Sequence, residues 1–378
     1  MKVARFALAM LAALTLVAPL NGLRAAALGT VAVPARTVDG FANARVPWRF
    51  VFPRDHGAHF AFATEWWYYT GHLRAADGRR FGYELTFFRS GLRPGDPTPA
   101  PGQSRWRGNQ VYPAHLALTD ERGRRFVYDE RFEREALGMG RASDRGLDVA
   151  AGDWTLRGTD PIRMRAATDE VRFDLTQVAE KPPAVHGRDG VSLKGSCASC
   201  ASHYYSFTRL RTAGRLRYGG RTFHVDGTSW MDHEFGSDEL HDQVGWDWFS
   251  VQLDDRREIM DYRLREKNGT ITPESSGSLI DPRGAVRYLA LADVVVDATG
   301  SWKSPHTGAA YPSGWRMRVP SARLDLVLVP LLADQELANT AGGTSYWEGA
   351  VDVNDAATGR HLGAGYVELT GYAGPLSL

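Results

Sequence analysis

Residues 65–73, Glu-Trp-Trp-Tyr-Tyr-Thr-Gly-His-Leu, are followed by a turn and by Phe-Gly-Tyr-Glu-Leu at 81–85. Residues 245–253, Gly-Trp-Asp-Trp-Phe-Ser-Val-Gln-Leu, are likewise followed by a turn and by Met-Asp-Tyr-Arg-Leu at 260–264. Aromatic and β-branched runs separated by turn residues are typical of antiparallel strands. The chain therefore contains two similar strand–turn–strand units.

The two units align, and this alignment predicts two copies of one fold. It matches Trp66 with Trp246, Tyr69 with Phe249, Leu73 with Leu253 and, with one gap, Tyr83 with Tyr262 and Leu85 with Leu264. Chance similarity between aromatic strands is the alternative. Short apolar runs between Gly, Asp, Asn and Pro extend the pattern along the chain, so we expect an all-β protein with two barrel-like domains.

The first residues are typical of a secretory signal. Lys2 and Arg5 precede an uncharged apolar run at 6–18, and Ala25, Ala26 and Ala27 supply small residues for cleavage. The run is shorter than the about 20 residues of a transmembrane helix. We expect a signal peptide at 1–27 and a periplasmic or secreted protein; an N-terminal membrane anchor is the alternative.

Length and charge indicate the domain number and the class of partner. The length that remains after residue 27 suits two domains, which we expect at 45–215 and 216–378. Lys and Arg number 45 and Asp and Glu number 44, so the surface gives no basis for binding nucleic acid.

The only cysteines are Cys197 and Cys200. An exported chain favours a disulfide between them, with free thiols and a redox or metal role as alternatives. A metal site would need more ligands than the nearby His203 adds. We therefore expect no metal and no other cofactor.

Strand alternation divides the second unit into two faces. One face would carry Asp247 with Phe249, Val251 and Leu253; the other would carry Trp246, Trp248, Ser250 and Gln252. Because both faces hold large apolar groups, we expect one to fill a barrel and the other to meet the partner domain. Asp247, on the more apolar face, must be paired or have a raised pKa.

The densest polar cluster is Asp232-His233-Glu234. On a strand Asp232 and Glu234 would share one face and His233 would take the other. The cluster has the groups for a general acid and its orienting partner, although a turn whose acids cap backbone amides is an equal alternative. Two more acids, Glu65 and Glu348, stand beside tryptophans and serve either a pocket or a structural pair. The chain contains no common nucleophile, metal or nucleotide motif.

Several of these motifs together resemble the lipocalin-like family that includes AttH proteins and carotenoid 1,2-hydratases (hydroxyneurosporene synthases), above all its branch of predicted secreted hydrolases. The resemblance runs from about residue 48 to the end. The segments that carry it are 65–73, 202–206, 230–236, 245–253, 346–351 and 365–372.

The resemblance implies two lipocalin-like antiparallel β-barrels packed together. The hydratases of the family add water to a carbon–carbon double bond of an acyclic carotenoid, which requires a proton donor and a pocket that stabilises a carbocation. Here Asp232, His233, Glu234 or Asp247 would donate the proton. The ligand-binding candidates are Glu65, Trp66, Trp67, Tyr68, Trp230, Trp246, Trp248, Tyr262 and Trp347.

Two functions from different classes follow. The first is an exported protein that binds a hydrophobic lipid or isoprenoid-like ligand, in association with an ABC-type permease as AttH proteins are thought to work. The second is a hydratase, isomerase or hydrolase acting on an apolar substrate by acid–base chemistry. The lack of a nucleophile or metal motif favours the first, and a signal peptide departs from an enzyme of carotenoid synthesis. The enzyme function gains support if residues 232–234 and Asp247 face a pocket.

Overall fold

The computed structural model describes residues 35–95, 102, 104, 106–197, 199–237, 243–338 and 344–374. The expected signal peptide at 1–27 lies outside the described residues. In this part of the chain no helix has the length and apolar character needed to cross a membrane.

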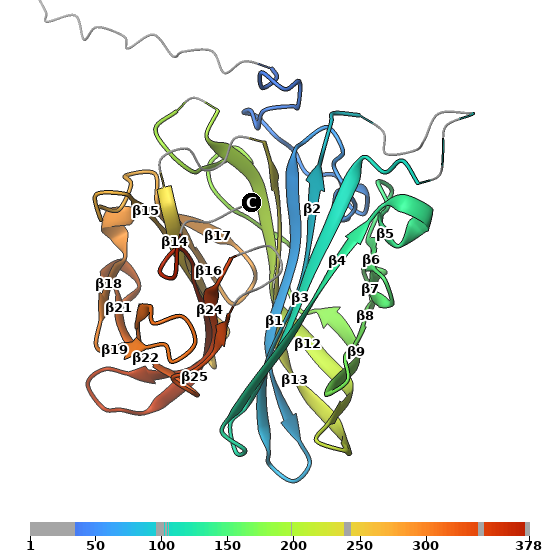
Figure 1. Ribbon diagram of the computed structural model, residues 1–378. Coiled ribbons are helices and arrows are strands. Elements are labelled where there is room, and N and C mark those ends of the chain that lie inside the picture. The colour runs from blue at the N-terminus through green and yellow to red at the C-terminus, as the bar shows by residue number, and fades with distance from the viewer. Residues whose placement is uncertain are drawn as a thin grey trace, which may run out of the picture. The chain divides into compact units, whose positions relative to one another are not determined.

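The first antiparallel sheet has the order β4-β3-β2-β1-β13-β12-β9-β8-β7-β6-β5 and wraps into a nearly closed barrel (Figure 1). The short strands β10 and β11 also pair with β12. The strands are β1 (Thr64–Ala75), β2 (Arg80–Gly91), β3 (Gln110–Asp120), β4 (Arg125–Arg134), β5 (Gly140–Ala142), β6 (Asp148–Ala151), β7 (Trp154–Arg157), β8 (Ile162–Ala167), β9 (Val171–Ala179), β10 (Ala184–Val185), β11 (Ser192–Leu193), β12 (Ala201–Tyr218) and β13 (Arg221–Gly236).

The second antiparallel sheet has the order β17-β16-β15-β14-β25-β24-β22-β21-β18 and forms a half-barrel, with β23 paired to β24. Its strands are β14 (Gln243–Leu253), β15 (Glu258–Glu266), β16 (Ser276–Ile280), β17 (Val286–Ala290), β18 (Val295–Ala298), β21 (Trp315–Val319), β22 (Leu324–Pro330), β23 (Glu336–Leu337), β24 (Tyr346–Asp355) and β25 (His361–Leu369). The remaining elements are the β19 (Ser301–Lys303) and β20 (Ala310–Pro312) pair and the 3-10 helices η1 (Arg54–His56), η2 (Ala136–Gly138), η3 (Leu291–Asp293) and η4 (Pro320–Ala322). The expected all-β fold of two lipocalin-like barrels is confirmed.

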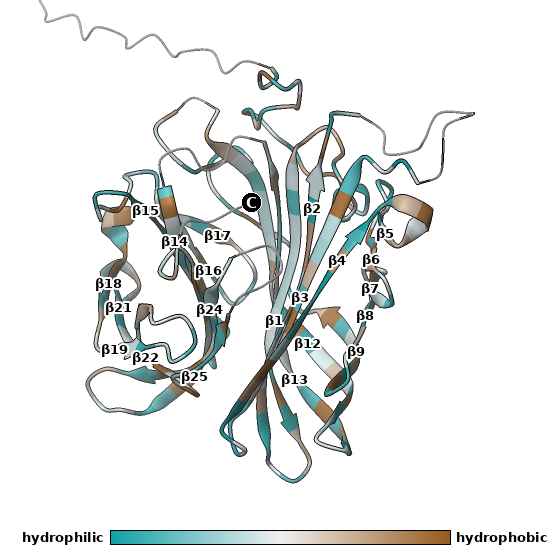
Figure 2. Ribbon diagram, in the orientation of Figure 1, coloured by the Kyte–Doolittle hydropathy of each residue, from teal (hydrophilic) through white to brown (hydrophobic). Residues whose placement is uncertain are grey.

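Period-two alternation places one face of each strand in a core. Hydrophobic and hydrophilic residues alternate along β12 and β13 (Figure 2). On β1, Trp67, Tyr69 and Leu73 belong to the core of the first barrel. On β14, Phe249 and Val251 belong to the core of the second. Burial of these side chains is the main stabilising contribution to both sheets.

The opposite faces of β1 and β14 lie between the two sheets, as the alternation in the second unit predicts. Tyr68, Trp248 and Tyr262 are members of one buried apolar cluster between the sheets, and Trp66 and Trp246 pack against it. These central strands are therefore buried on both faces, which is why they read as nearly continuous aromatic runs.

The repeat is a pair of hairpins, β1–β2 and β14–β15. Aligned residues of the first strands, β1 and β14, point to equivalent sides. Trp66 and Trp246 lie between the sheets, and Tyr69 and Phe249 lie in the barrel cores. The second strands do not agree: Tyr83 fills the first barrel whereas Tyr262 lies between the sheets. The single gap in the alignment explains the difference, because a shift of one residue reverses the face of a strand.

The change from one sheet to the other comes later in the chain than the expected boundary between 215 and 216. That position falls inside β12, and β13 returns to the first sheet up to Gly236. The second sheet begins at Gln243. Sequence gives no sign of this, because β12 and β13 form one long hairpin whose turn at Gly219 and Gly220 resembles a linker.

The two sheets approach closely where β2 crosses β24. A Cβ placed on Gly82 would lie 2.4 Å from the Cβ of Ala350. Nearby, Thr119 donates a hydrogen bond to Gln335 at 2.6 Å, and His115 contacts the Tyr346 hydroxyl at 2.6 Å. Glycine at position 82 is thus what allows these strands to pack at this distance.

We expect Gly82→Val to destabilise the protein by about 1–3 kcal/mol, since the added side chain forces the sheets apart. Chemical denaturation measures the change. The double variant Gly82→Val with Ala350→Gly should regain part of the loss, and Thr222→Val, at an exposed position of β13, serves as the control. A Gly82→Val variant as stable as the control would show that the close approach is not required.

Candidate functional site

A pocket lies between the sheets, near the starts of β1, β14 and β24 and the ends of β2, β13 and β25. The space left free between its side chains is about 70 Å³. The lining residues are Trp66, Tyr68, Thr86, Phe88, Lys194, Tyr204, Asp232, Glu234, Trp246, Trp248, Tyr262, Leu264, Tyr346 and Glu368.

Antiparallel pairing brings the polar members of this lining together. Trp66 is directly opposite Glu234, and Tyr68 is directly opposite Asp232. In the second sheet Trp248 is directly opposite Glu368. Residues opposite one another in an antiparallel pair share a face, so each pair of strands presents an aromatic ring beside a carboxyl group.

Asp232 is buried and accepts three hydrogen bonds. The Tyr204 hydroxyl donates to its Oδ2 at 2.6 Å, and the Trp230 indole donates to its Oδ1 at 2.6 Å. The Ser206 hydroxyl also donates to Oδ1. Burial raises the pKa of Asp232 to about 7, while the three donors act in the opposite direction by stabilising the carboxylate.

Glu368 is the second carboxyl group of the pocket. The Trp246 indole donates to its Oε2 at 2.9 Å. Burial raises the pKa of Glu368 to about 7, and the nearby carboxyl of Asp232 adds to the effect. With one donor rather than three, Glu368 has a free oxygen on which a proton can reside.

Glu234 is paired rather than free. The Lys194 Nζ lies 2.6 Å from its Oε1, and the Ser202 hydroxyl donates to the same oxygen. The Lys194 ammonium also lies 4.2 Å from the centre of the Tyr262 ring and 5.2 Å from that of Tyr204. The aromatic faces of the pocket therefore accept a positive charge, as aromatic quadrupoles do.

His233, Glu65 and Trp67 lie outside the pocket, on the opposite face of β13 and β1. The His233 Nε2 lies 2.8 Å from Glu65 Oε1, and its ring stacks on Trp67. Burial lowers the pKa of His233. The alternation predicted from sequence separates His233 from Asp232 and Glu234 in this way.

Glu65 belongs to a network at the mouth of the first barrel. Arg89 donates to Glu65 Oε2 at 2.8 Å, and both side chains are fully buried. Burial alone would raise the pKa of Glu65, but Arg89 and the hydrogen bonds from His233 and His59 hold it well below its usual range. Arg89 also donates to Gln110 and to the main chain of Phe62. This carboxylate is a structural partner of an arginine.

His59, Glu65 and His233 are the three residues in the described chain whose donor atoms meet within 4.8 Å of one another, the spacing a metal ion would need. Glu65 Oε1 is within 2.8 Å of both His59 Nδ1 and His233 Nε2. Its other oxygen already binds Arg89 and the His59 amide. Hydrogen bonds thus account for every atom of the cluster.

Three further residues predicted for the site lie elsewhere. Asp247 points into the second barrel, where Arg265 Nε lies 3.1 Å from its Oδ1 and the Tyr372 hydroxyl donates to it at 3.0 Å. Burial raises its pKa. Trp347 fills the second core, and Trp230 lies behind Asp232 rather than on the pocket surface. The sequence indicates that these residues are buried, but it does not show whether they line the pocket between the sheets.

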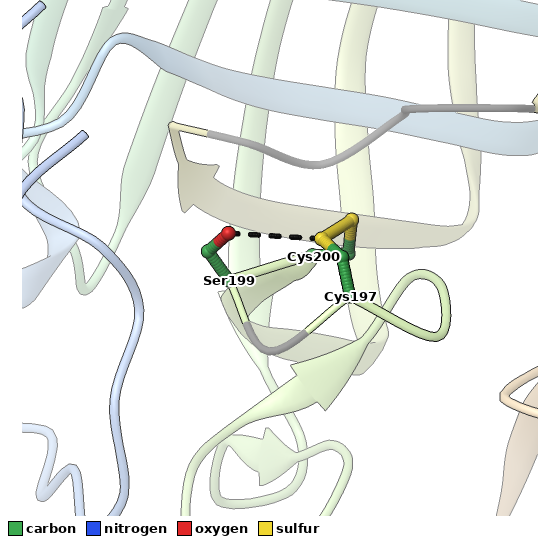
Figure 3. Close-up of a disulfide and its surroundings, with 3 residues drawn as sticks. All are labelled: Cys197, Ser199 and Cys200. Carbon is green, nitrogen blue, oxygen red and sulfur yellow. Dashed lines mark hydrogen bonds between the residues drawn. A yellow bond between two sulfur atoms is a disulfide. The ribbon is translucent and has the colours of Figure 1, made fainter. Parts of the chain in front are cut away.

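Cys197 and Cys200 form a disulfide, with the Ser199 hydroxyl 3.6 Å from Cys197 Sγ (Figure 3). The bridge closes the turn between β11 and β12. The Lys194 amide donates to the Cys200 carbonyl at 2.7 Å, so the bridged turn carries the lysine that pairs with Glu234.

Sequence reasoning identifies Asp232, Glu234 and most of the aromatic lining, but not Lys194, Tyr204 or Glu368 as site residues. Tyr204 reads as core, and it is buried. Glu368 stands on the last strand and meets Asp232 only across the gap between the sheets. Lys194 is in a loop with no periodic pattern. Alternation predicts which side of its strand each residue faces. The residue that it meets on the opposite sheet depends on how the two sheets pack.

Comparisons with known proteins identify the family and agree with the fold. The sequence profile of the AttH-like family matches residues 43–372. An AttH protein of known structure from Nitrosomonas europaea is 32% identical, with a TM-score of 0.78 over 88% of this chain and 100% of its own. Kievitone hydratase from Nectria haematococca is 15% identical, with a TM-score of 0.62 over 88% of this chain and 96% of its own, and shares the fold. No curated protein matches the sequence.

We expect Arg89→Met to destabilise the protein by about 3–5 kcal/mol, because it leaves the Glu65 carboxylate buried without its main counter-charge. Chemical denaturation measures the loss. Arg125→Met, which removes an exposed partner of Glu170, is the control and should cost less than about 1 kcal/mol. Adding Glu65→Gln to Arg89→Met should recover part of the stability. Similar losses for the two arginine variants would contradict the structural role of this pair.

Proposed function

Since the chain belongs to the AttH-like family, we propose that the pocket between its sheets binds an apolar, unsaturated molecule and hydrates a carbon–carbon double bond by acid–base catalysis. The observation that carries the proposal is a pair of carboxyl groups, the buried Asp232 and the partly buried Glu368, on the walls of one aromatic pocket. Two carboxyl groups whose surroundings differ are the usual means of supplying an acid and a base together.

The hydrogen bonds favour one assignment of the two roles. Glu368, with one donor, carries a proton and gives it to one carbon of the double bond, forming a C–H bond. The other carbon becomes cationic beside the aromatic rings, each of which stabilises a cation by about 0.5–2 kcal/mol. Asp232, whose three donors favour the carboxylate, takes a proton from the water that forms the C–O bond. The product gains one H and one OH, and the two carboxyl groups exchange protonation states.

The fold supports this class of chemistry without naming the substrate. The same fold carries a hydratase in kievitone hydratase, a protein of low sequence identity. In this chain the Lys194 ammonium lies 4.2 Å from the centre of the Tyr262 ring, which supports a role of the aromatic wall in stabilising a cation. A charge that develops in the same place during the reaction meets the same rings.

A binding role without turnover is the second candidate, favoured by the mostly aromatic lining. In that case a lipid or isoprenoid-like molecule occupies the same pocket. Export by residues 1–27 and association with an ABC-type permease stay predictions for both functions.

We expect Glu368→Gln and Asp232→Asn each to lower turnover by at least about 100-fold, since each removes one proton transfer. The assay supplies farnesol and geranylgeraniol in oxygen-18 water and measures labelled alcohol by mass spectrometry. The wild-type rate should peak near pH 7, because Asp232 becomes protonated at lower pH and Glu368 loses its proton at higher pH. Glu170→Gln, an exposed change, is the control. Full turnover by either pocket variant would exclude these roles.

The binding role predicts a co-purified ligand. Native mass spectrometry of the protein from its own host should show an added apolar mass that Trp248→Ala reduces, because Trp248 supplies pocket surface. A clean unliganded mass, together with no binding of farnesol or of phospholipid, would count against a binding function.

A further inference from the structure

A second cavity, of about 400 Å³, lies between the two sheets. Along β2 and β24 the close contact between Gly82 and Ala350 separates it from the aromatic pocket. Its described lining contains no Phe, Tyr or Trp, and charged and polar side chains face it instead. Such a wall favours a polar ligand, because its donors and acceptors need hydrogen-bond partners.

Gln252 on β14 presents a hydrogen-bond acceptor to this cavity. The residue is 8% exposed, and its Nε2 donates to the main-chain carbonyls of Thr208 at 2.7 Å and Ser229 at 3.0 Å. Both amide N–H groups are thus used, which fixes the orientation of the amide and directs Oε1 away from these carbonyls. The Oε1 atom accepts no hydrogen bond from the described residues, and protein atoms do not enclose it.

His72 on β1 presents a second acceptor. Its Nε2 lies 2.8 Å from the carbonyl oxygen of Gly365, and because a carbonyl can only accept, Nε2 carries the hydrogen. Burial lowers the pKa of His72, so the ring is neutral at pH 7 and Nδ1 has a lone pair. No described residue donates to Nδ1, and the side chain lines the cavity.

The strand register places these two residues side by side. His72 is directly opposite Thr228, which adjoins the serine that binds the Gln252 amide. Gln252 is directly opposite Ala364, which adjoins the glycine that binds the His72 ring. Each side chain is therefore held by a hydrogen bond to the opposite sheet, and each has an acceptor atom left for a ligand.

Two of the arginines that line the cavity are already paired. Arg80 forms an ion pair with Asp352, and Arg209 Nε lies 2.6 Å from the fully buried Glu258. Both guanidinium groups are thus engaged by carboxylates of the protein, so neither offers an unneutralised charge to an anion.

The exposed side of the cavity has an excess of negative charge. Asp226, Asp254 and Arg74 line it, are exposed and form no ion pair within the described part of the chain. Two carboxylates therefore accompany one guanidinium. An excess of one sign of charge in a cleft attracts a ligand of the opposite sign, here a cation.

We propose that this cavity binds a small primary ammonium compound. The N–H groups of the ligand donate to Gln252 Oε1 and His72 Nδ1, and its positive charge faces Asp226 and Asp254. An anion would meet the lone pairs of both acceptors, and a quaternary ammonium ion has no N–H group to donate to them. The site is separate from the aromatic pocket, and the proposal does not depend on hydration or lipid binding there.

Isothermal titration calorimetry at pH 7 tests the class of ligand. Ethanolamine and putrescine, which carry primary ammonium groups, should bind the purified protein. Tetramethylammonium, which has the same charge as ethanolamine but no donor, should bind at least about tenfold more weakly, and acetate should not compete. Equal binding of tetramethylammonium, tighter binding of acetate, or no binding of either amine would overturn the proposal.

Variants test the residues. His72→Gln retains a side-chain amide that can donate to the Gly365 carbonyl but removes the Nδ1 acceptor, and it should weaken ethanolamine binding at least about tenfold. The double variant Asp226→Asn with Asp254→Asn changes exposed residues and should weaken binding about threefold or more. Arg74→Gln should leave binding unchanged or tighten it, and Glu170→Gln is the distant control.

Thermal unfolding shows whether His72→Gln is folded. If it is not, the double aspartate variant and Arg74→Gln decide the question, because neither changes a paired or buried side chain. Unchanged affinity in the double variant, or weaker ethanolamine binding by Arg74→Gln, would overturn the proposed site.

Discussion

The central constraint on this protein is that the strands between its two sheets are buried on both faces. One face of β1, β2, β13, β14, β24 and β25 fills a barrel, and the other meets the opposite sheet. Where the two sheets meet, these strands have no solvated face to which polar side chains can be assigned. Asp232 and Glu234 in this layer are hydrogen-bonded or paired, and the pocket arises where aromatic and carboxyl side chains share the layer between the sheets.

Much of the arrangement of these side chains follows from the two-residue alternation of side chains along a strand. Alternation predicts that Asp232 and Glu234 share a face without His233, and that Trp246 and Trp248 oppose Phe249. The alignment of the two units gives the wrong side for Tyr262, because it contains one gap and a shift of one residue reverses the face of a strand. Alternation gives no information on partners across the layer. Glu368 and Asp232 meet only because two separate sheets pack together, and no local pattern in either strand encodes that contact.

The structure contains two kinds of buried acid, and the difference between them is chemical. Glu65 binds Arg89, His59 and His233, and each of its oxygens has a donor. Such a network holds a barrel mouth in one conformation. Glu84 and Glu348 form no ion pair with a Lys, Arg or His of the described residues, and burial raises the pKa of both carboxyl groups.

The disulfide turn has a kinetic consequence. The free space in the pocket holds no more than a few water molecules, and Lys194 fills part of its wall through Glu234 and Tyr262. A ligand larger than this space has to displace side chains of the wall, to which the Lys194–Glu234 ion pair belongs. The Cys197–Cys200 bridge and the hydrogen bond from the Lys194 amide to the Cys200 carbonyl tie this lysine to the closed turn. For a ligand that enters here, we expect displacement of this wall, rather than diffusional encounter, to set the association rate.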